Sequence, residues 1–339
     1  MRFFRLALSV IVSAVIFANA LVLPALAQTV IPAPSAAAAA SAAPEVGYDP
    51  TKPTANQAIE VIKAGEQKSF IWEVKSASNT VFLFGTIHVG KKSFYPLPAS
   101  VESAFKRSGK LVLEADISKT DDNTEINKLI AYTPPDSLEK HLPAALTQRL
   151  KQQLARLKLP QKNINQMKPF LVGGLLSLSE FSRLGYDMNY GVEGYLLGQA
   201  RENNKPVLEL ESQLGQIKML NDMSPVLQEA FLDNAIAALE TGKTPDQIDG
   251  MVSAWQNGDA KLIQDVTAEA TKGARWRGEL DEILLYRRHP DMLKKIEDYL
   301  AEDQAHAQAY FVAVGSMHLV GPRGLIEMLT AKGYRIRQL

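Results

Sequence analysis

The sequence has 339 residues and contains no cysteine. This absence excludes disulfide bonds, thiolate metal sites and lipid attachment through an N-terminal cysteine. The chain also has no excess of charge of either sign, because lysine plus arginine and aspartate plus glutamate both total 37. A nucleic-acid-binding protein would usually present a basic surface, so no nucleic acid is expected as a partner.

Several standard catalytic signatures are missing too. There is no H-E-x-x-H, no G-x-S-x-G and no G-x-G-x-x-G in the chain. The segment GTIHVGKKS (85–93) is close to a phosphate-binding loop, but Lys92 occupies the position of the hydroxyl that binds Mg²⁺, and Pro96 and Pro98 prevent the helix that must follow. A serine triad and a nucleoside-triphosphate site are therefore disfavoured.

The N-terminus predicts export. Two arginines precede an uncharged apolar stretch and the sequence Ala25-Leu26-Ala27, which is typical of a bacterial secretory signal and its cleavage site. We therefore predict a signal peptide at residues 1–27 and a periplasmic or secreted location. The stretch from Leu6 to Leu23 is long enough to anchor an uncleaved protein, so a membrane association is expected only if the signal is retained.

Residues 28–57 are rich in alanine and proline and have almost no large apolar side chains. Such a segment cannot bury a core, which predicts a disordered tether. The remainder, residues 58–339, is expected to form a single domain. Strand-like segments lie at both of its ends, and a division in the middle would leave each half with only a fragment of a sheet.

The pattern of apolar residues predicts an α/β fold of mixed type, with a central mixed sheet formed by both ends of the chain and a helical middle region covering it. The segments 71–74 and 80–85 predict a hairpin. A helix at 101–109 connects the strand at 80–85 to a strand at 110–116, and this order predicts that the two strands form a parallel pair. Helices are expected at 120–186, 191–204, 214–303 and 323–332, and further strands at 205–212, 309–318 and 334–339.

Two of the five histidines, His88 and His318, occupy matched positions. Each follows an apolar strand in the pattern Gly-x-x-His, with an apolar residue and another glycine after it. Loops that leave strand ends in α/β sheets commonly carry ligands, and a neutral imidazole is the commonest metal ligand and the usual general base. Either histidine alone could merely finish a strand. The repetition favours a shared metal ion or a shared substrate.

Carboxylates occur at comparable places. Glu114 and Asp116 end the strand KLVLEAD, and Glu209 and Glu211 lie on one face of VLELES. An acid at the tip of an apolar strand is costly unless it has a partner. Glu114 is the preferred metal ligand or general base, and Glu211 is the next candidate because it is nearer the strand end. Ion pairs at the rim of the sheet are the structural alternative for each.

The other histidines and a pair of arginines are harder to assign. Arg287 and Arg288 could bind a carboxylate or phosphate, or could face solvent. His289 is expected to cap the helix that follows it. His141 and His306 are expected at the surface, because their surroundings are helical and polar.

Together these segments resemble the TraB/GumN family, which is related to the Tiki metalloproteases. The resemblance covers about residues 65–339. It implies a compact α/β fold built from two related halves. It rests on GTIH (85–88), LVLEAD (111–116), GVEGYLLGQARENNKPVLELES (191–212), RHPDM (288–292) and AVGSMHLVGPRGLIEMLTAKGY (313–334).

The Tiki branch is understood as metal-dependent proteases that favour manganese or cobalt. Matched motif by motif, the resemblance implies that His88, His318 and Glu114 bind a divalent metal ion, Mn²⁺ or Co²⁺. Glu211 falls on the glutamate of the family's L-E-T pattern, and Arg288 on the arginine of its R-N pattern. Two departures are Ser212 in place of the threonine and His289 in place of the asparagine, and the second weakens any role assigned to that asparagine.

The sequence therefore predicts an exported metal-dependent hydrolase that acts on peptides. His88 and His318 would bind the metal, Glu114 would ligate it or activate water, and Arg288 would orient the substrate, with Glu211 as a further catalytic candidate. One alternative is a non-catalytic periplasmic protein that binds or sequesters a peptide or another small ligand at the same place without metal. Another is an envelope scaffold that works through residues 120–186.

Overall fold

The computed structural model describes residues 68–116, 123–242, 244–271, 276–302 and 308–339. The predicted signal peptide (1–27), the predicted tether (28–57) and His306 lie outside these ranges, so those predictions are untested. Within the described residues, no helix combines the length and the apolar character needed to cross a membrane.

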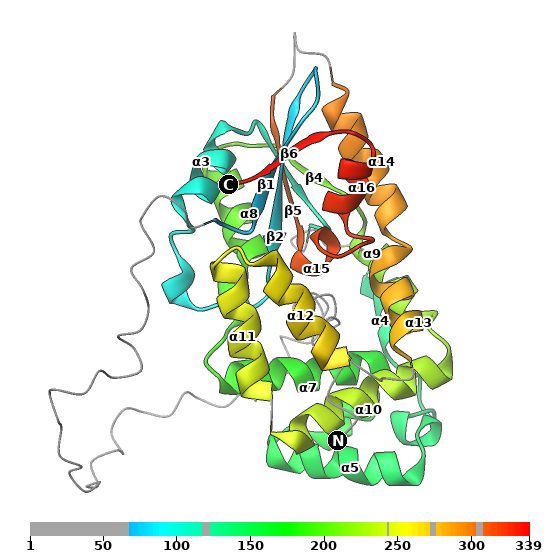
Figure 1. The fold of residues 1–339 in the computed structure, drawn as a ribbon. Helices are drawn as coiled ribbons and strands as arrows, with labels where there is room; N and C mark the ends of the chain where they lie inside the picture. The colour runs from blue at the N-terminus through cyan, green and yellow to red at the C-terminus, as the bar shows by residue number, and fades with distance from the viewer. Residues whose placement is uncertain (1–67, 117–122, 243, 272–275, 303–307) are drawn as a thin grey trace, which may run out of the picture.

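A mixed sheet lies at the top of the molecule in Figure 1. The described part of the chain forms one six-stranded sheet in the order β4-β3-β5-β2-β1-β6. The four strands from β4 to β2 run parallel, and β1 is antiparallel to β2 and β6. The strands are β1 (Ile71–Lys75), β2 (Thr80–Thr86), β3 (Lys110–Leu113), β4 (Val207–Glu209), β5 (Tyr310–Gly315) and β6 (Arg335–Gln338).

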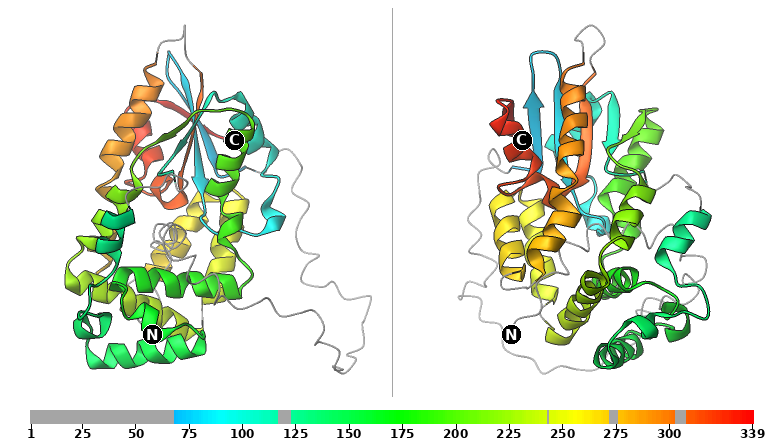
Figure 2. Two further views of the ribbon diagram at one scale, coloured as in Figure 1. Left: turned by 180° about the vertical axis from the view of Figure 1, so that it is seen from behind. Right: turned by 90° about the vertical axis from the view of Figure 1, so that its right-hand side faces the viewer.

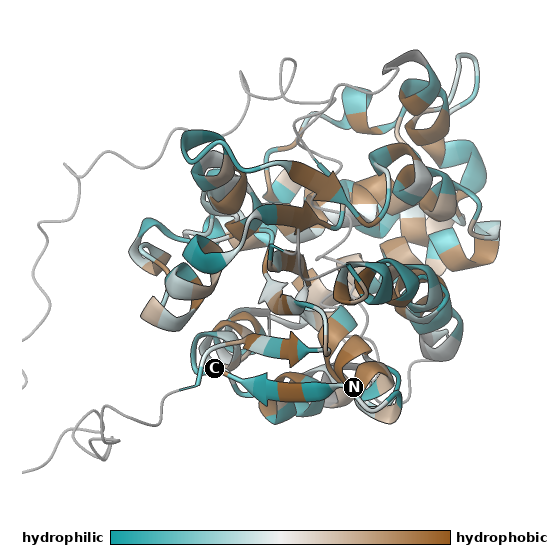
Figure 3. Cartoon of the chain, turned by 90° about the horizontal axis from the view of Figure 1, so that it is seen from above, coloured by the Kyte–Doolittle hydropathy of each residue, from teal (hydrophilic) through white to brown (hydrophobic). Residues whose placement is uncertain are grey.

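The mixed α/β class and the hairpin of β1 and β2 are confirmed. The predicted pairing of β2 with β3 is wrong, because β5 lies between them and pairs with both. Every residue of β5 is buried, and such a strand belongs in the interior of a parallel sheet. By contrast, β6 alternates between exposed and half-buried residues at one edge, and Figure 3 shows more hydrophilic colour on it than on the central strands.

Three predicted strands end earlier than expected, and all three differences concern the candidate site. β4 ends at Glu209, so Glu211 lies beyond the strand. β3 ends at Leu113, so Glu114 is the first residue beyond the strand. β5 ends at Gly315, and residues Ser316–Leu319 form a short helix, α15. His318 is therefore on a helical turn rather than on a strand.

Helices pack on both sides of the sheet. Figure 1 shows α3 and α8 on one side and α14 and α16 on the other. Their apolar residues join the strands in one hydrophobic core, which also includes part of α11. The bounds are α3 (Ala99–Arg107), α8 (Val192–Glu202), α11 (Thr244–Gln256), α12 (Ala260–Thr271), α14 (His289–Leu300) and α16 (Leu325–Ala331).

The other helices form a second layer below the carboxyl ends of the parallel strands (Figures 1 and 2). They have a core of their own, and Met317, next to His318, packs against both cores. That residues 58–339 form a single domain, and that the sheet consists of two related halves, remain predictions. The bounds are α4 (Asn123–Ile130), α5 (Ala144–Arg156), α6 (Gln161–Ile164), α7 (Pro169–Arg183), α9 (Gln213–Asn221), α10 (Pro225–Thr241) and α13 (Arg277–Asp281).

Gly85, the first residue of the first Gly-x-x-His segment, lies near the end of β2 and is required by close packing. A Cβ atom at this position would lie 2.4 Å from the ring of Phe70 and 3.0 Å from Oγ of Ser316. The carbonyl of Gly85 also accepts a buried hydrogen bond of 2.7 Å from Nε1 of Trp255. The glycine thus allows a core aromatic ring to lie directly against the backbone just before His88.

We predict that Gly85→Ala lowers the free energy of unfolding by about 1–3 kcal/mol, because the added methyl group overpacks the core. The matched control is Gly198→Ala in the interior of α8, where a Cβ atom would meet nothing within 4 Å. This control should raise the free energy of unfolding by about 0.5–1 kcal/mol, since alanine favours the helix. Urea unfolding followed by circular dichroism measures both, and equal stabilities would contradict the packing argument.

Candidate functional site

The predicted site residues come from four segments that are distant in sequence. His88 lies two residues after β2, Glu114 directly after β3, Glu211 two residues after β4, and His318 three residues after β5. Because these four strands are parallel neighbours, their carboxyl ends meet at one edge of the sheet.

The two Gly-x-x-His segments leave adjacent strands. Thr86 at the end of β2 is paired with Gly315 at the end of β5. Oγ of Ser316 donates a 2.9 Å hydrogen bond to the carbonyl of Thr86, which joins the two segments just before their histidines. The matched sequence pattern thus corresponds to a real spatial pair.

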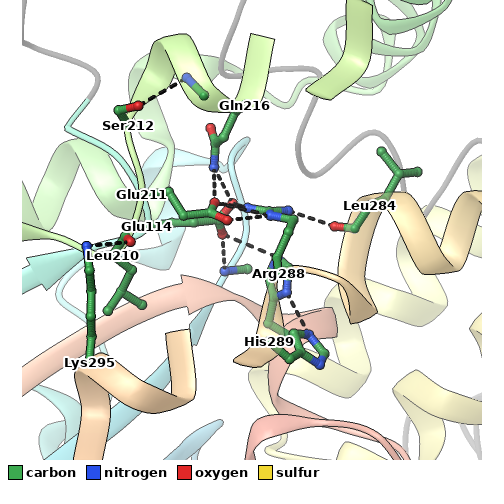
Figure 4. Close-up of polar contacts among 12 residues, drawn as sticks. Glu114, Leu210, Glu211, Ser212, Gln216, Leu284, Arg288, His289 and Lys295 are labelled. Carbon is green, nitrogen blue, oxygen red and sulfur yellow. Dashed lines mark hydrogen bonds and ion pairs between the residues drawn. The ribbon is translucent and has the colours of Figure 1, made fainter. Parts of the chain in front are cut away.

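Arg288 binds both predicted glutamates (Figure 4). Its Nε donates to Oε1 of Glu211 at 2.9 Å, and its Nη2 donates to Oε2 of Glu211 at 2.5 Å and to Oε1 of Glu114. Its Nη1 donates to the carbonyl of Leu284 at 2.7 Å. Each nitrogen of this buried guanidinium therefore has an acceptor in the protein.

Gln216 of α9 bridges the same two carboxylates. Its Nε2 donates to Oε1 of Glu114 at 2.7 Å and to Oε2 of Glu211 at 3.0 Å. The second oxygen of Glu114 accepts a 3.2 Å hydrogen bond from the backbone N–H of Gly315. Glu114 is thus bound to β5, to α9 and to Arg288, the residue directly before α14.

These contacts keep Glu114 ionised although it is buried. Burial acts to raise the pKa of its carboxyl group, but the positive charge of Arg288, followed by the influence of His318 and His88, lowers that pKa well below its usual range. Burial likewise acts to lower the pKa of Arg288, and the charges of Glu114 and Glu211 more than reverse this. The arginine and the glutamates form a buried ion cluster.

His88 contacts a carboxylate that the sequence analysis did not identify. Its Nδ1 lies 2.8 Å from Oε1 of Glu193 at the start of α8, and both side chains are buried. Burial acts to lower the pKa of His88, but the nearby charge of Glu193 outweighs it, so the pKa is raised. The N–H of Val192 donates to the carbonyl of Ile87 at 3.1 Å, which fixes the first turn of α8 against the histidine loop.

Gly191 makes this docking possible. A Cβ atom on Gly191 would lie 2.5 Å from the carbonyl oxygen of His88. The neighbouring Gly90 exchanges backbone hydrogen bonds with Asp187, at 3.0 and 2.8 Å. Gly90 and Gly191 therefore allow the close approach of two loops, and this approach presents Glu193 to His88.

His318 contacts a second histidine. Its Nδ1 lies 2.9 Å from Nε2 of His289, and Nδ1 of His289 lies 2.7 Å from the carbonyl oxygen of Arg323. Burial, followed by the charge of Arg288, sets the pKa of His318 well below its ordinary value. The pKa of His289 is lowered as well, again chiefly by burial.

The interpretation of His289 as a helix cap is wrong. It is the first residue of α14, it makes no capping bond, and its side chain is 1% exposed. The helical turn around α15 brings His318 to it, which the sequence pattern could not indicate. Of the two arginines, Arg287 is exposed and Arg288 is buried. His141 is exposed, as predicted, and contacts Asp136.

Two ring nitrogens at this edge of the sheet are buried without a hydrogen-bond partner, namely Nε2 of His88 and Nε2 of His318. The second of them lies 3.6 Å from Oε2 of Glu114, too far for a hydrogen bond. Imidazole nitrogens and a carboxylate oxygen are donors that suit a divalent transition metal. Among the described residues, however, no group of three or more such side chains is already gathered as a metal site.

The structure thus brings Glu114, Glu211 and Arg288 into direct contact and places His318 beside Glu114. His88 is near enough to influence the pKa of both Glu114 and His318. The sequence analysis missed Glu193 and Gln216. Glu193 lies on the otherwise apolar buried stripe of α8, and this spacing was the available signal, whereas Gln216 shares the buried face of α9 with Gln213 and does not stand out.

Comparison with known proteins finds relatives that cover most of the chain. Protein YbaP of Escherichia coli (strain K12), described as uncharacterized, is 27% identical over 247 residues, which cover 73% of this chain and 86% of the relative, and YbaP of Shigella flexneri gives the same values. The metalloprotease TIKI homolog of Amphimedon queenslandica is 23% identical over an alignment of length 352, which covers 85% of this chain and 64% of the relative. No solved structure matches.

A family model matches most of the chain. It matches residues 70–338, from the residue before β1 to the end of β6, and therefore includes all four strand ends that carry the site. The chain belongs to the TraB/PrgY/gumN family.

Proposed function

We propose that this protein is an exported metal-dependent hydrolase that cleaves peptides. The observation that carries the proposal is that Nε2 of His88 and Nε2 of His318 are buried without a hydrogen-bond partner at the edge of the sheet where Glu114 is buried and paired with Arg288. Similarity to a protein named as a metalloprotease supports the reaction class.

In this proposal His88, His318 and Glu114 hold a divalent cation, Mn²⁺ or Co²⁺. Such a cation would polarise a peptide carbonyl and make water a usable nucleophile near neutral pH. Glu193 fixes the ring of His88 through Nδ1, which leaves Nε2 for the cation. Arg288 holds Glu114 in place through Nη2.

Glu211 is suited to a different task from Glu114. Its side chain is 19% exposed, whereas that of Glu114 is 4% exposed, although the same arginine binds both. A buried carboxylate suits a ligand, and a partly exposed one can exchange protons with water or substrate. We therefore assign Glu211 as the general acid–base candidate.

Arg288 was predicted to orient the substrate. Its contacts favour another role, because Nε, Nη1 and Nη2 all donate to groups of the protein. It acts in this proposal as a positioning residue that sets the separation of Glu114 and Glu211.

The alternative is a non-catalytic protein that binds a peptide or another small ligand. It is favoured by one observation. Glu114 already accepts hydrogen bonds from Arg288, Gln216 and Gly315, and these donors compete with a cation for its oxygens. In this alternative, ligand binding survives removal of metal.

We predict that purified protein cleaves peptides when Mn²⁺ or Co²⁺ is added and stops when the metal is chelated with EDTA. His318→Ala should lower kcat/KM by more than about 100-fold, since loss of a ligand should cost at least as much as loss of an outer partner. His141→Ala is the matched control, because that ring lies at the surface. Equal rates for the parent and His318→Ala would refute the proposal, and peptide binding that persists in EDTA without cleavage would support the alternative.

We predict that Arg288→Leu lowers the free energy of unfolding by about 3–5 kcal/mol, because two carboxylates lose their buried partner. Arg149→Leu is the control. Arg149 also binds two carboxylates, Asp233 and Glu240, but its side chain is 34% exposed, so the loss should be within about 1 kcal/mol. Thermal and urea unfolding measure both variants. Similar losses would show that the buried cluster contributes no more than a surface pair.

Export is tested separately. We predict that expression in a bacterial host with its export machinery yields mature protein in the periplasm with Gln28 as its first residue. N-terminal sequencing of the periplasmic fraction checks this. A membrane-bound product that retains residue 1 would instead support an uncleaved anchor.

A further inference from the structure

His289 and His318 form a chain of two imidazoles that ends on a backbone carbonyl. Nδ1 of His289 lies 2.7 Å from the carbonyl oxygen of Arg323, and Nε2 of His289 lies 2.9 Å from Nδ1 of His318. The ring centroids are 5.1 Å apart with an interplanar angle of 71°. Each histidine is 1% exposed, so water has little access to these contacts.

The direction of both hydrogen bonds follows from the carbonyl. A carbonyl oxygen can only accept, so the proton of the first bond must be on Nδ1 of His289. In a neutral imidazole the other nitrogen is then an acceptor, so the proton of the second bond must be on Nδ1 of His318. A cationic His289 would reverse the second bond, but it would place another buried positive charge directly beside Arg288.

The remaining nitrogen of His318 is thereby left without a proton. This Nε2 atom is buried, has no hydrogen-bond partner, and lies 3.6 Å from Oε2 of Glu114. An ionised carboxylate at that distance favours the opposite tautomer, in which Nε2–H would turn and donate to it. The bond from His318 to His289 opposes this, so the two neighbours of His318 compete for one proton.

We infer that His289 is a positioning residue, which holds His318 in the Nδ1–H tautomer and keeps the Nε2 lone pair of His318 free for a ligand beside Glu114. Its catalytic consequence rests on the proposed function, but the tautomer does not. Figure 4 shows that Arg288 reaches the glutamates while His289, the next residue, points away from them. Two consecutive residues thus contact different parts of the site, Arg288 the glutamates and His289 the ring of His318.

His88 has a different orienting group. Its Nδ1 lies 2.8 Å from Oε1 of Glu193, and its Nε2 atom is buried without a hydrogen-bond partner. There the orienting group is a carboxylate, whereas at His318 it is a neutral ring. His289 therefore orients His318 without adding a negative charge behind it.

The experiment uses the full chain labelled with ¹⁵N-histidine, without metal, and reads the tautomer from two-bond ¹H–¹⁵N correlations. The chain has five histidines, so single substitutions assign each ring. The parent should show the Nδ1–H pattern for His318. His289→Phe should shift His318 to the Nε2–H pattern, while His289→Gln, whose amide oxygen can accept from Nδ1, should retain the parent pattern. His141→Phe should leave His318 unchanged.

The rate provides a second readout. With Mn²⁺ or Co²⁺, His289→Phe should lower kcat by about 10–100-fold with little change in KM, and His289→Gln should recover most of this loss. A parent spectrum with Nε2–H on His318, or an unchanged His318 in His289→Phe, would overturn the inference. If His289→Phe does not fold, His289→Gln decides, because loss of the Nδ1–H pattern in that variant overturns the inference and its retention supports it. Absence of cleavage by every protein, the parent included, would refute the proposed function and leave the tautomer to be decided by the spectra.

Discussion

The arrangement of the site depends on one buried guanidinium. Arg288 lies at the start of α14 and binds carboxylates that follow two strands, Glu114 after β3 and Glu211 after β4. Removing three charged groups from water is costly, and the cost is offset only while every partner is present. Lys295, further along α14, adds a 2.8 Å hydrogen bond to the carbonyl of Leu210. The cluster therefore fixes α14 against the carboxyl edge of the sheet.

The two histidines have different electrostatic surroundings. Burial opposes the charged form of both rings, but His88 has Glu193 beside it and its pKa is raised, whereas His318 lies under the influence of Arg288 and its pKa is lowered. A repeated sequence pattern thus produces two rings with similar positions and opposite electrostatic surroundings. The two rings differ because their partners come from different helices, Glu193 of α8 for His88 and His289 of α14 for His318.

Close backbone approach is the second constraint on the site. Gly85 allows a core ring to lie against β2, and Gly191 allows α8 to dock on the carbonyl of His88. Both glycines act through contact distance, so neither needs an unusual backbone angle. Gly85 and Gly191 therefore belong to the packing that holds the segment of His88 in place.

Local sequence determined which residues stand at the strand ends. The apolar runs that become β2, β3 and β5 can be recognised from their composition, because strands buried on both faces are almost wholly apolar. The polar residues His88, Glu114 and His318 follow these runs within three residues. Only the tertiary structure decided that β5 lies between β2 and β3 and that Gln216, Glu193 and His289 complete the site. Strand order and ring contacts arise from pairing between distant segments, and no local pattern encodes which distant segment will neutralise a buried charge or accept a buried proton.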